Sequence, residues 1–505
     1  MVIKVLLLLV FFGVMVAVGL YCRKKATNVN DFVLGGRSVG PWLTAFAYGT
    51  SYFSAVIFVG YAGQFGWKYG LASTWIGIGN AIIGTFIAWL VLGKRTRIMT
   101  HHLNSKTMPE FFEKRYNSKT LKIVASIIVF VFLIPYTASL YNGLSRLFGM
   151  AFDIDYSLCV IIMAVLTGIY VIAGGYMATA INDFIQGIIM LIGIVAVIFA
   201  VLNGQGGFTE AIKSLSEVED QAANINAGAF SSLFGPDPVS LLGVVILTSL
   251  GTWGLPQMVH KFYAIKSKNA IKTGTIVSTI FSIIIAGGCY FLGGFGRLFG
   301  DKINVATDGY DTIIPTMLNG LSDLLIGVVV ILVLSASMST LSSLVLTSSS
   351  TLTLDFIKGN IVKNMEEKKQ LLLMRILIVF FITISVVIAL IQYKTKVTFI
   401  AQLMGISWGA LAGCFLAPFL YGLYMKMTSK IAVGACFIFA SSVMVTNIFF
   451  GKHFPKLLQS PINCGAFVMI AGLIMIPVIS WFTKPKDRDY VEEVYSCYIQ
   501  QNDFE

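Results

Sequence analysis

The sequence predicts an all-α polytopic membrane protein with about thirteen transmembrane helices. Of its 505 residues, 56% are hydrophobic and only 12% are charged, a composition far outside that of soluble globular domains. Runs of roughly 20 apolar residues recur along the chain, as helices that cross a bilayer require. The net charge of +12 resides mainly in short segments between these runs. This placement indicates membrane topology and contact with anionic lipid headgroups in the bilayer rather than binding to nucleic acid.

The first helix is expected at 2–21, as an anchor rather than a cleaved leader, because Arg23, Lys24 and Lys25 follow it directly. The remaining spans are expected at 39–66, 70–93, 120–148, 156–174, 178–202, 238–259, 270–295, 318–352, 372–392, 397–424, 430–450 and 462–482.

The distribution of Lys and Arg between the segments that connect the spans tests this arrangement. If the N-terminus lies outside, 26 of the 36 Lys and Arg residues fall on inner segments, which are 22–38, 94–122, 175–177, 260–272, 353–375, 425–430 and the tail from 483. Loss of one helix would mix the two groups of segments. The asymmetry therefore predicts an odd number of spans in the cell membrane, with the N-terminus outside and the C-terminus in the cytoplasm.

The spans divide into two sets of five, at 39–202 and 238–424. Because five is odd, the two sets must enter the membrane in opposite directions, so they form an inverted repeat. The expected organisation is an anchor helix with its inner loop (1–38), a first repeat (39–202), an outer loop with short amphipathic pieces (203–237), a second repeat (238–424), two peripheral helices (425–482) and a cytoplasmic tail (483–505).

Each repeat begins with a span that carries helix-breaking signals. In the first repeat, the stretch 47–60 places Gly49 beside Thr50, Ser51 and Ser54. In the second, 251–257 (GTWGLPQ) holds two glycines and a proline in mid-span. Interrupted helices at membrane depth line cavities, and interruptions at matching places in two halves point to a transporter binding site. A simple proline kink at the second place is the alternative.

Hydroxyl side chains form one face of the span 318–352. Ala336, Ser339 and Thr340 are spaced i, i+3, i+4, and Ser339, Ser342 and Ser343 repeat that spacing. Such a face can pack helices together. It can equally supply the oxygen ligands that a hard cation such as Na⁺ prefers.

Asp183 lies about one turn inside an apolar span, with no basic residue near it in sequence. An acid at that depth is expensive and predicts function, although a solvated residue near a helix N-terminus is the alternative. If its helix packs against the hydroxyl face, Asp183 would add a negative charge to the cation site. No Lys or Arg is expected deep in any span.

Six stretches of the chain resemble the sodium:solute symporter family, which includes bacterial proline permease. They are DFVLGGRSVGPWLTAFAYGTSYFS (31–54), IPYTASLYNGLSRLFG (134–149), IAGGYMATAINDFIQG (172–187), WGLPQMVHKFYAIKS (253–267), SASMSTLSSLVLTSSS (335–350) and GISWGALAGCFLAPFLYGLY (405–424). The resemblance implies the inverted-repeat fold of the amino-acid/sodium (LeuT-like) symporters, with broken first and sixth core helices and alternating access.

The resemblance also implies ligands for sodium. The usual site falls on the carbonyl groups of Thr50, Phe53 and Ala336 and the hydroxyl groups of Ser339 and Thr340. A second site, found in some members, falls on Asp183, Ser339, Ser342 and Ser343, so one or two sodium ions are expected.

For the solute, the resemblance and the polar or aromatic residue types together indicate a set of six side chains. Proline permease carries an Asp where this chain has Tyr52, and its aromatic substrate residue is replaced here by Thr252, beside Trp253, whereas Tyr136 is retained. The six expected residues are Tyr52, Ser54, Tyr136, Thr252, Trp253 and Gln257.

The expected function is therefore uptake of a small organic solute, an amino acid such as proline, driven by inward sodium movement. Monocarboxylates, vitamin-like acids and sugars remain alternative solutes. A proton-coupled carrier that uses Asp183 and a non-transporting sensor of the same fold are further alternatives. An enzyme is not expected, because His101 and His102 are the only candidates for a reactive pair.

Overall fold

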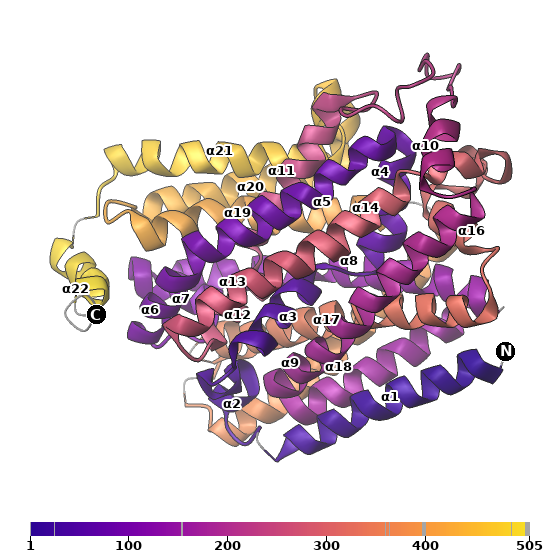
Figure 1. Cartoon of the computed structure of the whole chain (residues 1–505). Helices are drawn as coiled ribbons and strands as arrows, with labels where there is room; N and C mark the ends of the chain where they lie inside the picture. Colours follow the sequence, from indigo (N-terminus) through magenta and orange to yellow (C-terminus); the bar gives the residue numbers. More distant parts are fainter. Residues whose placement is uncertain are drawn as a thin grey trace.

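The computed structural model describes residues 2–24, 26–152, 155–358, 360–362, 364–395, 400–485 and 487–499, and most of them are helical. Figure 1 shows the long helices side by side along one axis. The α-helices are α1 (Val2–Arg23), α2 (Val29–Leu34), α3 (Pro41–Tyr52), α4 (Ala62–Tyr69), α5 (Thr74–Ala81), α6 (Lys94–His102), α7 (Met108–Tyr116), α8 (Lys119–Phe152), α9 (Tyr156–Gly204), α10 (Phe208–Ser216), α11 (Pro238–Gly254), α12 (Pro256–Ala264), α13 (Lys268–Ser282), α14 (Gly288–Gly293), α15 (Val305–Asp308), α16 (Ile313–Leu318), α17 (Asp323–Thr351), α18 (Glu367–Thr395), α19 (Ile400–Tyr424), α20 (Lys430–Phe450), α21 (Pro461–Phe482) and α22 (Arg488–Ile499).

Shorter π and 3₁₀ segments connect or extend these helices. They are η1 (Gly35–Arg37), η2 (Val56–Tyr61), η3 (Gly70–Ser73), η4 (Ile82–Ile87), η5 (Trp89–Gly93), η6 (Ile283–Gly287), η7 (Gly296–Lys302), η8 (Tyr310–Thr312), η9 (Leu352–Ile357), η10 (Gly451–His453) and η11 (Lys456–Leu458).

Within the described residues, ten helices are long and apolar enough to span a membrane, or eleven if α11 and α12 form one span. That count treats Val56–His102 as one span, although Gly70 interrupts it with a φ of 61°. Likewise Gly175, with a φ of 57°, interrupts α9. Glycine is favoured at both turns because it alone lacks the Cβ that makes a positive φ unfavourable. Thirteen spans thus remain a prediction.

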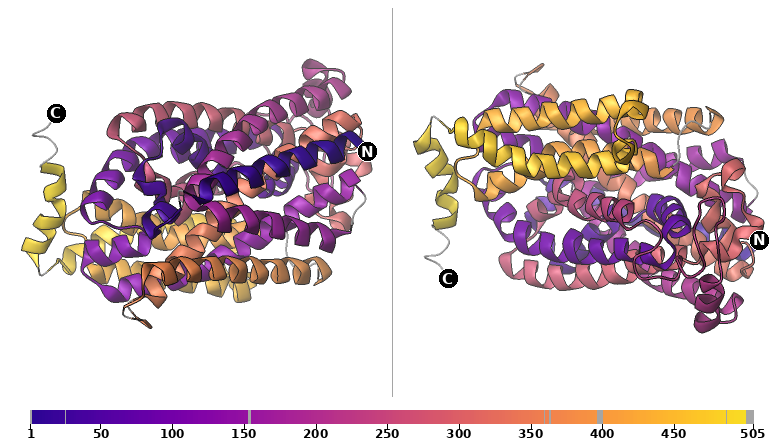
Figure 2. Two further views of the ribbon diagram at one scale, coloured as in Figure 1. Left: turned by 90° about the horizontal axis from the view of Figure 1, so that it is seen from below. Right: turned by 90° about the horizontal axis from the view of Figure 1, so that it is seen from above.

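The first helix, α1, begins at one end of the bundle, and the last helix, α22, lies at the opposite end (Figure 1). Peripheral helices flank the core: α1 lies along one side, and α20 and α21 lie along the opposite side (Figure 2). Outward-facing side chains on these helices include exposed Leu9, Ile438 and Phe449. An apolar exterior of this kind is what a lipid-facing surface requires.

The core is built on α17 and α19, which lie among the other helices rather than at the edge. From Val329 to Thr351, α17 is almost entirely buried, hydroxyl side chains included. It packs against α3, α8, α9 and α18, and α19 packs against α8, α11, α20 and α21. The hydroxyl face of α17 is therefore inside the protein and not in lipid.

Both predicted interruptions are confirmed. The helix α3 ends at Tyr52, and Phe53 is extended with φ −88° and ψ 116°, before η2 restarts the span. The helix α11 ends at Gly254, and Leu255 is extended with φ −78° and ψ 121°. Pro256 then begins α12, which is bent from α11 by 44°. A proline is tolerated at a first helical position, where the missing N–H would have no partner.

Two sets of hydrogen bonds connect the broken spans, one directly and one through the carbonyl of Gly84. Val39, just before α3, pairs with Ile265, just after α12: the N–H of Val39 donates to the carbonyl of Ala264 at 3.3 Å, and the N–H of Lys266 donates to the carbonyl of Val39 at 2.9 Å. Farther along the same spans, the hydroxyl of Thr252 on α11 donates to the carbonyl of Gly84 at 2.8 Å. The hydroxyl of Tyr48 on α3 donates to the same carbonyl, also at 2.8 Å.

The long segment 203–237 holds one short helix, α10, as expected for an amphipathic piece. Its polar part is fastened to the bundle where Arg297 donates to the carboxylate of Asp220 at 2.9 Å. Partial burial raises the pKa of Asp220, but the hydrogen bond and charge of Arg297 outweigh that effect and hold the pKa below its ordinary value.

Candidate functional site

A cluster of five oxygen atoms lies where α17 passes the break between α3 and η2. The hydroxyl of Ser339 is 3.1 Å from the carbonyl oxygen of Thr50 and 3.0 Å from that of Ala336. The hydroxyl of Thr340 is 3.1 Å from the same two carbonyl oxygens and 3.3 Å from that of Phe53. All five residues are buried. The structure thus brings together every residue expected at the first ion site.

The chain path explains why these oxygens are available. The last four carbonyl groups of a helix have no partner within it, and Thr50 lies in that last turn of α3. The C-terminal end of a helix also carries a partial negative charge. On the other side, the i, i+3, i+4 spacing turns Ala336, Ser339 and Thr340 toward this helix end. The Thr340 hydroxyl has one hydrogen for three carbonyl neighbours, so the cluster holds more acceptors than donors and favours a cation.

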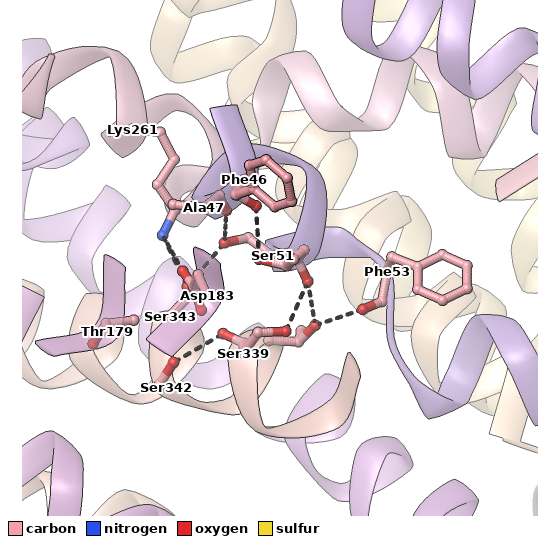
Figure 3. Close-up of polar contacts among 12 residues, drawn as sticks. Phe46, Ala47, Ser51, Phe53, Thr179, Asp183, Lys261, Ser339, Ser342 and Ser343 are labelled. Carbon is pink, nitrogen blue, oxygen red and sulfur yellow. Dashed lines mark hydrogen bonds and ion pairs between the residues drawn. The ribbon is translucent and has the colours of Figure 1, made fainter. Parts of the chain in front are cut away.

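A second cluster lies about one helical turn farther along α17 (Figure 3). Asp183 on α9 and Ser343 on α17 are both buried, and Ser51 on α3 is 3.0 Å from Ser343, hydroxyl to hydroxyl. Ser342 turns its hydroxyl back to the carbonyl of Ser339 at 2.9 Å. The helix that carries Asp183, α9, packs against α17 as expected, and the side chain of Lys261 links Asp183 to Ser343.

The second cluster also contains a basic side chain that the sequence did not lead us to expect. Lys261 on α12 is only 2% exposed, and its Nζ lies 3.8 Å from Oδ2 of Asp183. The same ammonium donates to the hydroxyl of Ser343 at 3.0 Å. The sequence predicts an inner loop from residue 260, but α12 continues to Ala264, so Lys261 lies within a helix and is buried against α9 and α17.

A signal for Lys261 was present in two facts taken together. A buried carboxylate needs a counter-charge, and a half-helix that starts at Pro256 is expected to run for more than one turn. The buried carboxylate of Asp183 predicts a basic side chain nearby. A half-helix that starts at Pro256 and runs for more than one turn includes Lys261, which makes that lysine the candidate.

Two of the expected solute residues meet beside the first break. The hydroxyl of Tyr136 on α8 is within hydrogen-bonding reach of the Ser54 side chain. The ring of Tyr136 also stands edge-on to buried Trp408 of α19, with ring centroids 6.0 Å apart. A Cβ at Gly251 would come within 3.0 Å of that indole. Trp408, which sequence reasoning missed, thus lies between Tyr136 and the end of α11.

Two other expected solute residues, Thr252 and Trp253, make hydrogen bonds to η4 in this structure. The Thr252 hydroxyl is bonded to Gly84, and the indole N–H of Trp253 donates to the carbonyl of Ile83 at 2.9 Å. These two side chains hold α11 against η4. The buried amide of Gln257 makes no hydrogen bond within the described structure. Tyr52 ends α3, but its side chain lies outside the described part of the structure.

Gln257 and Lys261 face one small pocket between α9, α12 and α17, which has no room for a water molecule. Its lining residues are Tyr176, Thr179, Gln257, His260, Lys261, Ser343, Leu346 and Thr347.

Comparison with known proteins places this geometry in context. The model of the sodium:solute symporter family matches residues 32–439. The chain is 28% identical to sodium/proline symporter 2 of Staphylococcus saprophyticus, over 94% of this chain and 91% of that protein. It is also 28% identical to the osmoregulated proline transporter of Bacillus subtilis, over 86% and 87%. Among solved structures, a Na⁺-coupled sialic acid symporter superposes with a TM-score of 0.75 at 18% identity, over 94% of this chain and 98% of that one.

Proposed function

Because this chain belongs to the sodium:solute symporter family, we propose that it is a secondary transporter that couples inward movement of Na⁺ to the uptake of proline. One observation carries the ion assignment: the hydroxyl groups of Ser339 and Thr340 converge with the carbonyl groups of Thr50, Phe53 and Ala336. The inverted repeat that the sequence predicts supplies the frame in which such a site would serve alternating access.

The proposed sodium site uses neutral oxygen ligands. Carbonyl and hydroxyl oxygens are the donors that a hard cation selects over nitrogen or sulfur. The unwound backbone at Phe53 and the partial negative charge at the end of α3 supply the compensation that a bound positive charge needs. The set Asp183, Ser339, Ser342 and Ser343 is the candidate for a second cation.

The proposed solute site lies beside the sodium site, at the two breaks. Ser54 and Tyr136 offer hydroxyl groups, and the Trp408 ring offers an apolar wall for the proline ring. The carboxylate of proline would accept from the N–H groups of Ala55 and Val56, which now donate over 3.3 Å to the hydroxyls of Ser337 and Ser54. Tyr52, Thr252, Trp253 and Gln257 complete the proposed set.

The proposed location is the cell membrane, with the N-terminus outside and the C-terminus in the cytoplasm. The opposite placement of the two ends in the bundle supports one end on each side of the membrane (Figure 1). The excess of Lys and Arg on the segments assigned to the inside supports the direction.

The test is uptake of radiolabelled proline by the purified chain in proteoliposomes, with an inward gradient of sodium or of choline. We expect uptake only with sodium, abolished by excess unlabelled proline. Unlabelled monocarboxylates and sugars serve as competitors for the alternative solutes. Uptake that is unchanged in choline would refute sodium coupling, and no uptake of labelled proline, with sodium-driven uptake of a labelled sugar or monocarboxylate instead, would refute the solute.

A further inference from the structure

The second cluster already contains a cation. The Lys261 ammonium lies 3.8 Å from the Asp183 carboxylate, 3.0 Å from the Ser343 hydroxyl and 5.2 Å from the centre of the Tyr176 ring. A negative charge, an oxygen lone pair and the face of an aromatic ring are each groups that stabilise a positive charge. Figure 3 shows the lysine side chain reaching across to Asp183 and Ser343.

The ammonium contacts two of the four residues expected to bind a second sodium ion, Asp183 and Ser343. Both carboxylate oxygens of Asp183 are buried and accept no hydrogen bond within the described structure, so the positive charge of Lys261 is their principal compensation. Two positive charges a few ångströms apart in a buried site repel strongly. The pocket that Lys261 lines has no room for a water molecule that would screen them.

The backbone fixes the lysine in this place. The helix α12 starts at Pro256, directly after the break, so Lys261 follows little more than one turn later. Its neighbour Phe262 packs against Tyr48 of α3, with ring centroids 5.4 Å apart. Just beyond the helix, Ile265 pairs with Val39. The ammonium is therefore held at the second cluster from both sides along the chain.

We propose that Lys261 is a built-in cation that fills the second ion site, so that this chain binds and transports one sodium ion per solute. The inference rests on the proposed sodium coupling and specifies how many sodium ions move with each solute molecule. With one ion, a membrane potential of 100 mV drives roughly 50-fold accumulation of a neutral or zwitterionic solute, and a second ion would square that ratio.

The test counts sodium ions in the full chain. Equilibrium binding of ²²Na⁺ to purified protein and the charge-to-proline ratio in proteoliposomes are measured for the wild type, Lys261→Met and Lys261→Met/Asp183→Asn. Lys266→Met, which changes an exposed lysine in the same segment, is the matched control. We expect one ion for the wild type and the control, two for Lys261→Met because the carboxylate is then free to bind sodium, and one again for the double variant.

The outcomes separate this inference from the proposed function. Two ions in the wild type, or one ion in a sodium-dependent Lys261→Met, would overturn the role of Lys261 and leave sodium coupling intact. No bound sodium in the wild type would remove the proposed function as well. If Lys261→Met cannot be purified, because it leaves a buried carboxylate unpaired, Lys261→Gln takes its place, since its neutral amide can still donate to Asp183; two ions are again expected, and one ion would overturn the role of Lys261.

Discussion

The two oxygen clusters on α17 share a helix face and differ in what stands opposite. At Ser339 and Thr340, the opposite wall is the broken end of α3, which offers carbonyl groups and no formal charge. At Ser343, the opposite wall is Asp183 with the ammonium of Lys261. The five groups of the first cluster include no positive charge, whereas the second cluster contains the ammonium of Lys261. One serine- and threonine-rich helix therefore presents a proposed ion site and an internal ion pair about one turn apart.

The difference arises from the two breaks. In the first repeat, the chain unwinds at Phe53 and leaves carbonyl groups without helical partners. In the second, the chain restarts at Pro256 and the new half-helix places Lys261 beside α9 and α17. The first break thus places carbonyl groups next to α17, and the second places an ammonium group there. The following variants test whether only the first of these two places binds sodium.

The largest effect is expected from Ser339→Ala combined with Thr340→Ala. Each hydroxyl that contacts a charged ligand contributes roughly tenfold to a hundredfold in affinity, so the double variant should lose saturable sodium dependence at any practical concentration. The measurement is proline uptake against sodium concentration. Ser349→Ala, which removes a buried hydroxyl farther along α17, is the control. Normal sodium dependence in the double variant would contradict the first site.

Asp183→Asn should act on stability more than on the sodium requirement. It leaves the buried Lys261 without its counter-charge, which lowers the free energy of unfolding by about 3–5 kcal/mol. Adding Lys261→Met should recover part of that loss, because the remaining pair is neutral. Thermal unfolding of all three variants in detergent gives the double-mutant cycle. Strictly additive losses would show that the two side chains do not interact.

Ser343→Ala should have an intermediate effect. The hydroxyl of Ser343 accepts from Lys261 and lies 3.0 Å from that of Ser51. Its removal should lower the free energy of unfolding by about 1–3 kcal/mol, without changing the number of bound sodium ions. A fall in the measured ion number would instead identify Ser343 as a ligand.

Ser342→Ala should have the smallest effect. The hydroxyl of Ser342 is turned back to the Ser339 carbonyl. If Lys261 fills the second site, the sodium concentration for half-maximal uptake should stay within about twofold of the wild type. A larger increase would assign Ser342 to an ion site.

Much of the arrangement could be predicted from the sequence because it follows from local rules. Helical spacing alone places Ala336, Ser339 and Thr340 on one face, and the glycines and proline of 251–257 predict the second break. These inferences need only the 3.6-residue period and the chemistry of proline.

What the sequence could not supply depends on contacts between distant segments. The sequence predicts a loop at Lys261 because the expected span ends at residue 259, whereas burial against α9 and α17 decides the environment of this lysine. Trp408 gives no local sign that it will stand between Tyr136 and Gly251. Thr252 and Trp253 have the side chains of solute ligands, yet their polar atoms are bonded to η4.

The pairing of Val39 with Ile265 ties the leading end of α3 to the trailing end of α12. The two half-spans belong to different predicted repeats, so these backbone hydrogen bonds couple the repeats at one end of the broken helices. If α3 or α12 moves during transport, either this pairing must break or the two half-spans must move together. In the second case, one movement would displace both the oxygen cluster near Thr50 and the ion pair of Lys261 with Asp183.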